Sequence, residues 1–139
     1  MIKRAESDVE IQKTFLVMNQ LRPFLTPDTY VARIRGLMST QGFRLAFLES
    51  DGGVQAVAGY RLQDMLYCGK FLSIDDLVTA EATRSMGYGA QLLDWLVEEA
   101  RREGGTQIEL LSSTVREGAH RFYFRNGFTI DAFHFRKKL

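Results

Sequence analysis

Six consecutive residues, Arg84-Ser85-Met86-Gly87-Tyr88-Gly89, separate an apolar run from a long amphipathic segment. The run before them, residues 71–78, is rich in apolar side chains and predicts a mostly buried strand. From about Gly87 to Arg102 the period becomes helical, with an apolar face made of Leu92, Leu93, Leu96, Val97 and Ala100. A glycine-rich turn between a strand and a helix leaves backbone N–H groups without intrahelical partners, at the positive end of the helix dipole. The turn therefore predicts a cradle for a phosphate or pyrophosphate group.

A tight strand-to-helix turn that binds nothing is the competing interpretation, because Gly-x-Gly is common before helices. Two other kinds of phosphate loop are excluded. The stretch lacks the Gly-Lys-Ser/Thr ending of the nucleoside triphosphatases. It also lacks the third glycine of the dinucleotide fingerprint, since position 92 is Leu, and no repeated strand–helix unit follows.

A second segment decides between these interpretations. It reads Ala119-His120-Arg121-Phe122-Tyr123-Phe124-Arg125-Asn126-Gly127-Phe128 and follows a strand-like stretch at 107–111. The Arg-x-x-Gly-x-Gly turn and the Ala-x-x-Phe-Tyr-x-x-x-Gly-Phe segment, in this order, resemble the GNAT superfamily of N-acetyltransferases. Tyr123 follows Arg84 by 39 residues, a separation that is ordinary in that superfamily. The motifs cover residues 70–130, and the order of the predicted elements extends the resemblance over nearly the whole chain.

The first half of the chain predicts two helices. A short strand at 2–5 precedes a helix that Ser7 or Asp8 caps and that runs to about Arg22, before Pro23. A second helix is predicted to start at Thr26-Pro27-Asp28, where a capping hydroxyl precedes a proline and an acid. Its apolar face is formed by Tyr30, Ile34, Leu37 and Met38.

The other predicted elements complete one domain. Two strands, at 42–49 and 54–62, surround the hairpin turn Asp51-Gly52-Gly53. Near the end of the chain, Gly127 is expected to terminate the Tyr123 helix, and Phe128 to begin a last strand. We expect a single acetyltransferase domain over residues 1–139, of the α/β (α+β) class, with a mixed, mostly antiparallel sheet flanked by helices.

Composition and charge restrict the function classes. Hydrophobic residues make up 45% of the chain and charged residues 25%, as in an ordinary globular protein. A formal net charge of +1 argues against a dedicated nucleic-acid binder. No apolar run approaches the roughly 18 residues that span a membrane, and residues 1–6 lack the apolar core of a signal peptide. The single cysteine, Cys68, fits a reducing compartment, so we expect a cytoplasmic protein without nucleic-acid or membrane partners.

The resemblance implies acetyl-coenzyme A (acetyl-CoA) as the cofactor and assigns the residues that bind it. Backbone groups of Leu77, Val78 and Thr79 are expected to pair with the pantetheine arm and to polarise the thioester carbonyl. The pyrophosphate is expected on N–H groups of Arg84, Ser85, Met86, Gly87, Tyr88 and Gly89. The Arg84 side chain either reaches phosphate as well or shapes the turn by hydrogen bonds. No metal site is expected.

Tyr123 is the predicted general acid, because the tyrosine of this motif in the family lies near the cofactor sulfur and donates to it. A phenol with a pKa near 10 is a weaker acid than a thiol with a pKa near 8.5. Donation therefore helps only as charge develops on the sulfur. The competing interpretation is a core tyrosine that packs beside Phe122 and Phe124.

Several groups are candidates for the general base that takes a proton from the amine. Asp75 and Asp76 precede the turn on the predicted strand, and strand alternation puts them on opposite faces. At most one then faces the acceptor, and one is expected to accept from the backbone or to bind an arginine. Deprotonation through water is the alternative, and His120 and His134 are further candidates.

The acceptor is predicted to be an amine of a small molecule or a peptide, attacked directly in a ternary complex. In such a fold the first helices and the following strand pair wall the acceptor site. Its lining is therefore expected among Met18, Leu21, Phe24, Tyr30, Tyr60, Asp64 and Tyr67. The same residues fit an ordinary core or the surface of a homodimer equally well.

Two other function classes stay open. A non-catalytic acyl-CoA sensor would keep Gly87 and Gly89 without needing Tyr123, so the retained tyrosine favours catalysis. An acetyltransferase acting on a macromolecule would modify a protein N-terminus, a lysine or charged transfer RNA. The near-neutral charge disfavours the RNA version, because phosphate contacts need clustered Lys and Arg.

Overall fold

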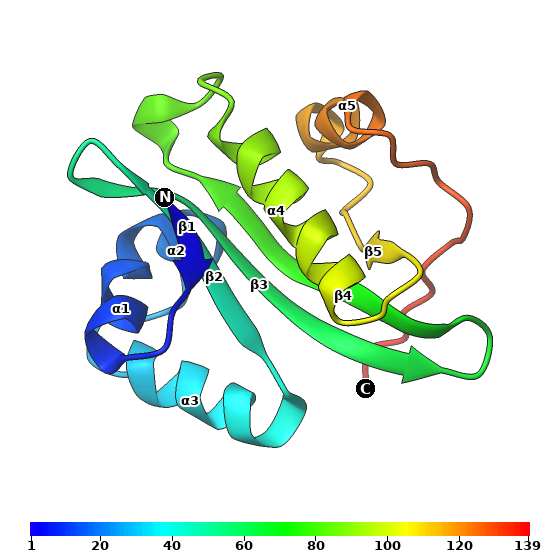
Figure 1. Cartoon of the computed structure of the whole chain (residues 1–139), viewed down its shortest axis with the longest axis horizontal. Coiled ribbons are helices and arrows are strands. Elements are labelled where there is room, and N and C mark those ends of the chain that lie inside the picture. The colour runs from blue at the N-terminus through cyan, green and yellow to red at the C-terminus, as the bar shows by residue number, and fades with distance from the viewer. The chain divides into compact units, whose positions relative to one another are not determined.

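A five-stranded sheet in the order β1-β2-β3-β4-β5 is the central element of the computed structural model, which describes residues 1–139 (Figure 1). Its strands are β1 (Ile2–Arg4), β2 (Arg44–Ser50), β3 (Gly53–Met65), β4 (Gly69–Thr79) and β5 (Ile108–Leu110). The pairs β1–β2, β2–β3 and β3–β4 are antiparallel. The predicted α/β class with a mixed, mostly antiparallel sheet is confirmed.

Five α-helices and one short 3-10 helix accompany the sheet. They are α1 (Asp8–Lys13), α2 (Phe15–Leu21), α3 (Tyr30–Gln41), η1 (Glu81–Thr83), α4 (Tyr88–Arg102) and α5 (Glu117–Arg125). None of them combines the length and the apolar composition that crossing a bilayer requires. The chain divides into two compact units, unit 1 (Met1–Glu109) and unit 2 (Leu110–Leu139). Within unit 1, α1 to α3 cover one face of the sheet and α4 covers the other (Figure 1).

Thr14 divides the helix predicted from Ser7 to Arg22 into α1 and α2. Ser7 is the cap of α1, since its hydroxyl accepts from the Glu10 N–H at 3.2 Å and the Glu10 carboxylate accepts from the Ser7 N–H at 3.2 Å. The buried Thr14 hydroxyl donates to the Ile11 carbonyl at 2.7 Å and lies 2.7 Å from the Tyr30 hydroxyl. This side-chain bond competes with the helix ladder, so one continuous helix was the wrong prediction.

α3 starts later than the sequence pattern indicates. The helix begins at Tyr30 and not at Thr26-Pro27-Asp28, because the Thr26 hydroxyl bonds the Thr29 hydroxyl and caps no N–H. Tyr30 and Ile34 are buried, and Leu37 and Met38 pack against the same core, so the predicted apolar face is confirmed.

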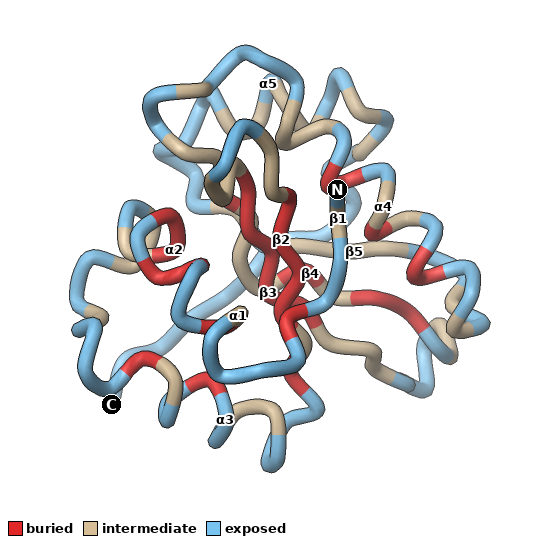
Figure 2. Tube along the Cα trace, turned by 60° about the vertical axis from the view of Figure 1, so that its left-hand side comes forward, coloured by how far each residue is buried: buried red, intermediate tan, exposed pale blue.

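The β2–β3 hairpin matches its prediction closely. Asp51 and Gly52 both have positive φ, 52° and 78°, as the two central residues of a type I′ turn require. β2 starts at Arg44 rather than at Gly42, because Gly42 ends α3 in a left-handed conformation, and it runs one residue further, to Ser50. β3 extends beyond its predicted range at both ends, from Gly53 to Met65. Buried residues concentrate on β2, β3 and β4, which run through the middle of unit 1 (Figure 2).

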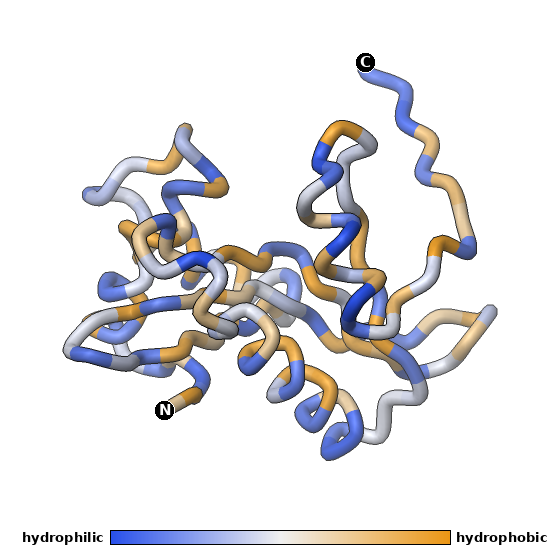
Figure 3. The backbone as a smooth tube through the Cα atoms, turned by 90° about the horizontal axis from the view of Figure 1, so that it is seen from above, coloured by the Kyte–Doolittle hydropathy of each residue, from blue (hydrophilic) through white to orange (hydrophobic).

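α4 presents its apolar residues to the sheet along one side (Figure 3). Leu92, Leu93, Leu96 and Ala100 are buried and Val97 is half-buried, which confirms the helical face read from the sequence. The glycine-rich turn therefore begins a helix that is anchored by burial of this face. Since buried side chains of this size each contribute roughly 1.5–3 kcal/mol, the start of α4 is held by its packing rather than by a cap.

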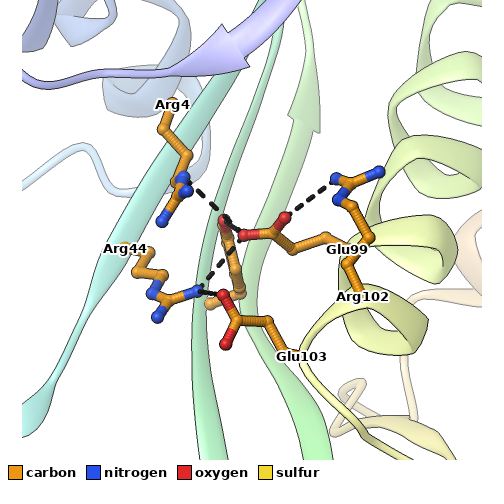
Figure 4. Close-up of polar contacts among 6 residues, drawn as sticks. Arg4, Arg44, Glu99, Arg102 and Glu103 are labelled. Carbon is orange, nitrogen blue, oxygen red and sulfur yellow. Dashed lines mark hydrogen bonds and ion pairs between the residues drawn. The ribbon is translucent and has the colours of Figure 1, made fainter.

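Glu99 is a charged residue inside this otherwise apolar face, and it is only 3% exposed. Its carboxylate accepts from Tyr60 at 2.9 Å, from Arg44 at 3.2 Å and from Arg102 at 2.8 Å. Arg4 Nε lies 3.7 Å from the same carboxylate (Figure 4). These contacts connect α4 to β1, β2 and β3, and they supply the partners that a buried charge needs.

Unit 2 contains α5 and an extended C-terminal segment. Gly127 has φ of 85°, and the N–H groups of Gly127 and Phe128 donate to carbonyls of the last helical turn at 3.2 and 3.0 Å, so the predicted helix end is confirmed. The prediction of a last strand from Phe128 was wrong: residues 128–139 form neither helix nor strand. Unit 2 holds no complete strand with which this segment can pair its backbone.

Candidate active site

The turn between β4 and α4 bends its backbone through two left-handed residues. Ser85 has φ of 71° and Gly87 has φ of 84°, on either side of Met86. Glycine adopts this conformation freely, whereas for serine it is uncommon and costs of the order of 1 kcal/mol. Strained backbone of this kind is concentrated at ligand-binding sites, and Ser85 and Met86 are both exposed.

Most N–H groups of the turn have no acceptor in the protein. The Met86 N–H donates to the Thr83 carbonyl at 3.4 Å, and the Arg84 N–H lies 3.5 Å from the Glu81 carbonyl. No side chain caps α4. The N–H groups without an acceptor are those of Ser85, Gly87, Tyr88, Gly89 and Ala90. Together with the helix dipole, this row of free donors is suited to an anion such as a pyrophosphate.

Gln55 on β3 holds the segment that leads into the turn. Its main-chain carbonyl accepts from the Ala80 N–H at 2.8 Å, and its side-chain oxygen accepts from the Thr83 hydroxyl at 2.8 Å. Its side-chain nitrogen donates to the Ser50 carbonyl at 2.9 Å. Gln55 therefore connects the β2–β3 hairpin to the turn, and no pattern in the sequence predicted this role.

The end of β4 carries the three residues predicted to contact a pantetheine arm. Leu77, Val78 and Thr79 face Ala58, Val57 and Ala56 on β3. Because hydrogen bonds alternate along an antiparallel pair and the Ala80 N–H bonds Gln55, the backbone of Val78 is directed to β3. The backbone groups of Leu77 and Thr79 are then directed to the opposite edge of β4.

Asp75 is the extra residue of a β-bulge. Gly59 on β3 faces Asp76 and Tyr60 faces Ile74, which leaves Asp75 without an opposite residue. The bulge interrupts the alternation of side chains, so the prediction that Asp75 and Asp76 lie on opposite faces by simple alternation was wrong.

Both acids are bound to arginines. Arg61 donates to Asp75 through Nε at 2.6 Å and Nη2 at 2.8 Å. Arg22 donates through Nε to Asp76 at 2.8 Å and through Nη2 to the Asp75 main-chain carbonyl at 3.0 Å. The expectation that one acid binds an arginine holds for both. Isolated arginines far apart in the sequence offered no signal for this cluster.

The carboxylate of Asp76 occupies space that only a glycine opposite it leaves free. A Cβ at Gly59 would lie 2.5 Å from Asp76 Oδ2 and 2.5 Å from the Phe43 ring. Burial raises the pKa of Asp76 above its usual value, while the ion pair with Arg22 opposes the rise. A carboxylate with a raised pKa is a better proton acceptor near neutral pH.

Tyr123 lies on α5 in unit 2 and is half-buried. Its ring packs against Phe122 at 5.4 Å and Phe128 at 5.6 Å between centroids. Burial raises its pKa, and its hydroxyl makes no hydrogen bond to another residue. His120 lies 2.7 Å from the Ser113 carbonyl through Nε2, and His134 is in the exposed C-terminal segment.

The residues expected to line an acceptor site divide into two groups. Met18, Tyr30 and Tyr60 belong to the core, at 2%, 0% and 0% exposed, as the alternative interpretation had it. Leu21 is half-buried and packs against the same core, whereas Phe24, Asp64 and Tyr67 are exposed.

The profile of the acetyltransferase (GNAT) family matches residues 12–128. The chain belongs to the GNAT family. The N-acetyltransferase YhdJ of Bacillus subtilis, itself uncharacterized, is 34% identical over 98% of this chain and 96% of its own length. The aminoalkylphosphonate N-acetyltransferase of Salmonella typhimurium is 36% identical over 70% of this chain and 62% of its own length. Glucosamine 6-phosphate N-acetyltransferase 1 of Oryza sativa is 30% identical over 86% of this chain and 75% of its own.

The fold of this GNAT protein recurs in solved structures. A ribosomal-protein-alanine N-acetyltransferase from Brucella melitensis superposes with a TM-score of 0.85 over 100% of this chain and 99% of its own, at 13% identity. At that identity the likeness concerns the fold alone. The family and its relatives establish the chain as an N-acetyltransferase, and membership of the family implies use of acetyl-CoA.

Proposed function

We propose that this GNAT protein transfers the acetyl group of acetyl-CoA to the amine of a small molecule, in a ternary complex. The observation that carries the proposal is the row of free N–H donors at Ser85, Gly87 and the first turn of α4. Because these donors meet the positive end of a 15-residue helix, they fit the charge and size of a pyrophosphate.

The proposed cofactor site continues from the turn along β4. The free main-chain donors of Ser85 and of residues 87–90 hold the pyrophosphate, and the Arg84 side chain and Ser85 hydroxyl add to them. Backbone groups of Leu77 and Thr79, which are directed away from β3, bind the pantetheine arm, while the backbone of Val78 between them is paired with β3. The bound thioester supplies the acetyl group, and the chain's own donors hold it in position.

Two proton transfers are assigned to side chains. We propose that the Asp75–Asp76 pair is the general base, which accepts the proton of the amine directly or through water, because these acids immediately precede Leu77. Tyr123 is the proposed general acid toward the departing thiolate, and its unbonded hydroxyl is consistent with that role. We also propose that residues 1–139 are a single acetyltransferase domain.

Two relatives support a small acceptor. The names of the Salmonella and Oryza enzymes specify an aminoalkylphosphonate and glucosamine 6-phosphate, which are small amines that also carry a phosphorus acid group. An acceptor on a peptide or protein, and a sensor that binds acyl-CoA without turnover, are the outcomes that would replace this proposal.

The test is calorimetric titration with acetyl-CoA, followed on the same sample by release of free thiol against a panel of amines. Wild-type protein is expected to bind and to release thiol only when an amine is present. Gly89→Trp is expected to abolish binding, because the indole fills the approach to the free N–H groups. Gly36→Trp is the control, since a Cβ at Gly36 in α3 meets nothing within 4 Å. Unchanged affinity in Gly89→Trp would overturn the site.

A further inference from the structure

Arg22 and Arg61 are cations at the Asp75–Asp76 bulge, and each keeps guanidinium N–H groups that no acceptor in the protein uses. A guanidinium carries five N–H donors. Arg22 uses Nε and Nη2, and Arg61 also uses Nε and Nη2, so Nη1 of each has no acceptor in the protein. Their side chains are 39% and 29% exposed, so both arginines are partly open to solvent.

The two ion pairs form one cluster of alternating charge. Arg22 pairs with Asp76 and reaches the main chain of Asp75, which itself pairs with Arg61. Because the four charges cancel, the cluster has no net attraction for a simple cation or a simple anion at a distance. It does match a ligand that carries an ammonium and an acid group a few atoms apart.

The cluster lies next to the segment proposed to bind the reactive end of the cofactor. Asp75 and Asp76 directly precede Leu77 on β4, while the proposed pyrophosphate site lies after Thr79 at the other end of that segment. An amine bound by these acids would therefore be beside the thioester end of the arm.

We propose that this cluster is the acceptor subsite and that it takes a small zwitterionic amine, with the ammonium on the Asp75–Asp76 carboxylates and the acid group on the free Nη1 donors of Arg22 and Arg61. The inference rests on the proposed function, which supplies the acetyl donor. Guanidinium binds phosphonate, phosphate and carboxylate by the same charge-assisted hydrogen bonds, so oxyanion chemistry defines the acceptor class.

The experiment compares kcat/KM for thiol release with three amines of similar length, 2-aminoethylphosphonate, 3-aminopropanoate and propylamine. At least one zwitterion is expected to exceed propylamine by roughly tenfold to a hundredfold, the range that hydrogen bonds to a charged group give. The two zwitterions separate a phosphorus acid from a carboxylate. Equal or lower kcat/KM for both, in protein that releases thiol with propylamine, would overturn the inference.

Arg22→Gln tests the cation itself. It is expected to reduce the ratio of kcat/KM for the preferred zwitterion to that for propylamine about tenfold, mainly through KM, and Arg22→Lys is expected to restore part of the ratio. Arg35→Gln is the matched control. Arg35 also donates through Nε to a carboxylate, that of Asp8, and through Nη2 to a main-chain carbonyl, but on α3.

Acetyl-CoA titration of each variant separates the two proposals. If the wild-type protein did not bind acetyl-CoA, the proposed function would be refuted, and this inference with it. Cofactor binding with an unchanged acceptor ratio in Arg22→Gln would refute the subsite alone.

Discussion

Asp75 and Asp76 are adjacent residues whose carboxylates have different surroundings. Asp75 accepts both bonds of a bidentate pair with Arg61, whereas Asp76 accepts one bond from Arg22 in a more buried place. Burial raises the pKa of Asp76, and the arginine opposes it. Of the two acids, Asp76 is therefore the better candidate for a base that works near neutral pH.

The proposed general acid is also tested by a single substitution, Tyr123→Phe. The variant is expected to lower turnover by roughly 10²–10⁴-fold, the usual contribution of a general acid, while acetyl-CoA affinity stays nearly unchanged. The phenylalanine keeps the ring packing against Phe122 and Phe128. The measurement is kcat across a range of pH, with affinity from calorimetry. If kcat were unchanged at every pH, Tyr123 would be a packing residue.

At the scale of elements, the turn before α4 depends on a strand that is distant in sequence. α4 is held by its apolar face, and β4 by its pairing with β3. The residues between them are connected to the rest of unit 1 through Gln55, and through Gln20, whose side-chain oxygen accepts from the Glu81 N–H at 3.0 Å. The geometry of the free N–H groups therefore depends on these amide side chains.

Gln55→Ala is expected to weaken acetyl-CoA binding by roughly tenfold, because it removes two hydrogen bonds of about 0.5–1.5 kcal/mol each that position the turn. Gln55→Glu keeps an acceptor for Thr83 and loses the donor to Ser50, so an intermediate affinity is expected. Gln63→Ala is the control, on the same strand but opposite Phe71. Equal affinities in all three variants would show that Gln55 does not position the turn.

At the scale of the whole molecule, Glu99 connects a helix to three strands of the sheet. Burial alone would raise its pKa, but hydrogen bonds from Arg102 and Tyr60 and the charge of Arg4 outweigh burial, and the pKa is lowered. A carboxyl with a lowered folded pKa stabilises the protein above its unfolded pKa. That stability is lost as the pH falls through the folded pKa.

Glu99→Gln is expected to destabilise the protein at pH 7 by about 2 kcal/mol, the scale of hydrogen bonds to a charged group. The difference from wild type is expected to shrink as the pH falls below the usual carboxyl range. The measurement is thermal or urea unfolding from pH 7 to acid. Glu98→Gln is the control, since Glu98 is an exposed residue of the same helix paired only with Arg101. If the difference in stability between Glu99→Gln and wild type did not change with pH, the negative charge of Glu99 would not be what stabilises the protein.

Local sequence patterns predicted much of the fold and the family. The Ser7 cap, the Asp51-Gly52 turn and the face of α4 were all confirmed. Each depends on backbone bonds or side-chain periodicity within a few residues, which a sequence displays directly. The two motifs around Gly87 and Tyr123 indicated the GNAT family, which the family profile and the relatives confirmed.

The sequence by itself determined the family, the helix after the turn and most element positions, because these follow from neighbours along the chain. Only the tertiary structure decided that Thr14 lies buried against Tyr30 where the helix breaks, that Asp75 is left unpaired in a bulge between Ile74 and Asp76, and that both acids are bound by Arg22 and Arg61. These features depend on partners between 14 and 54 residues away. Folding brings such partners together, and no local pattern records which of them will meet.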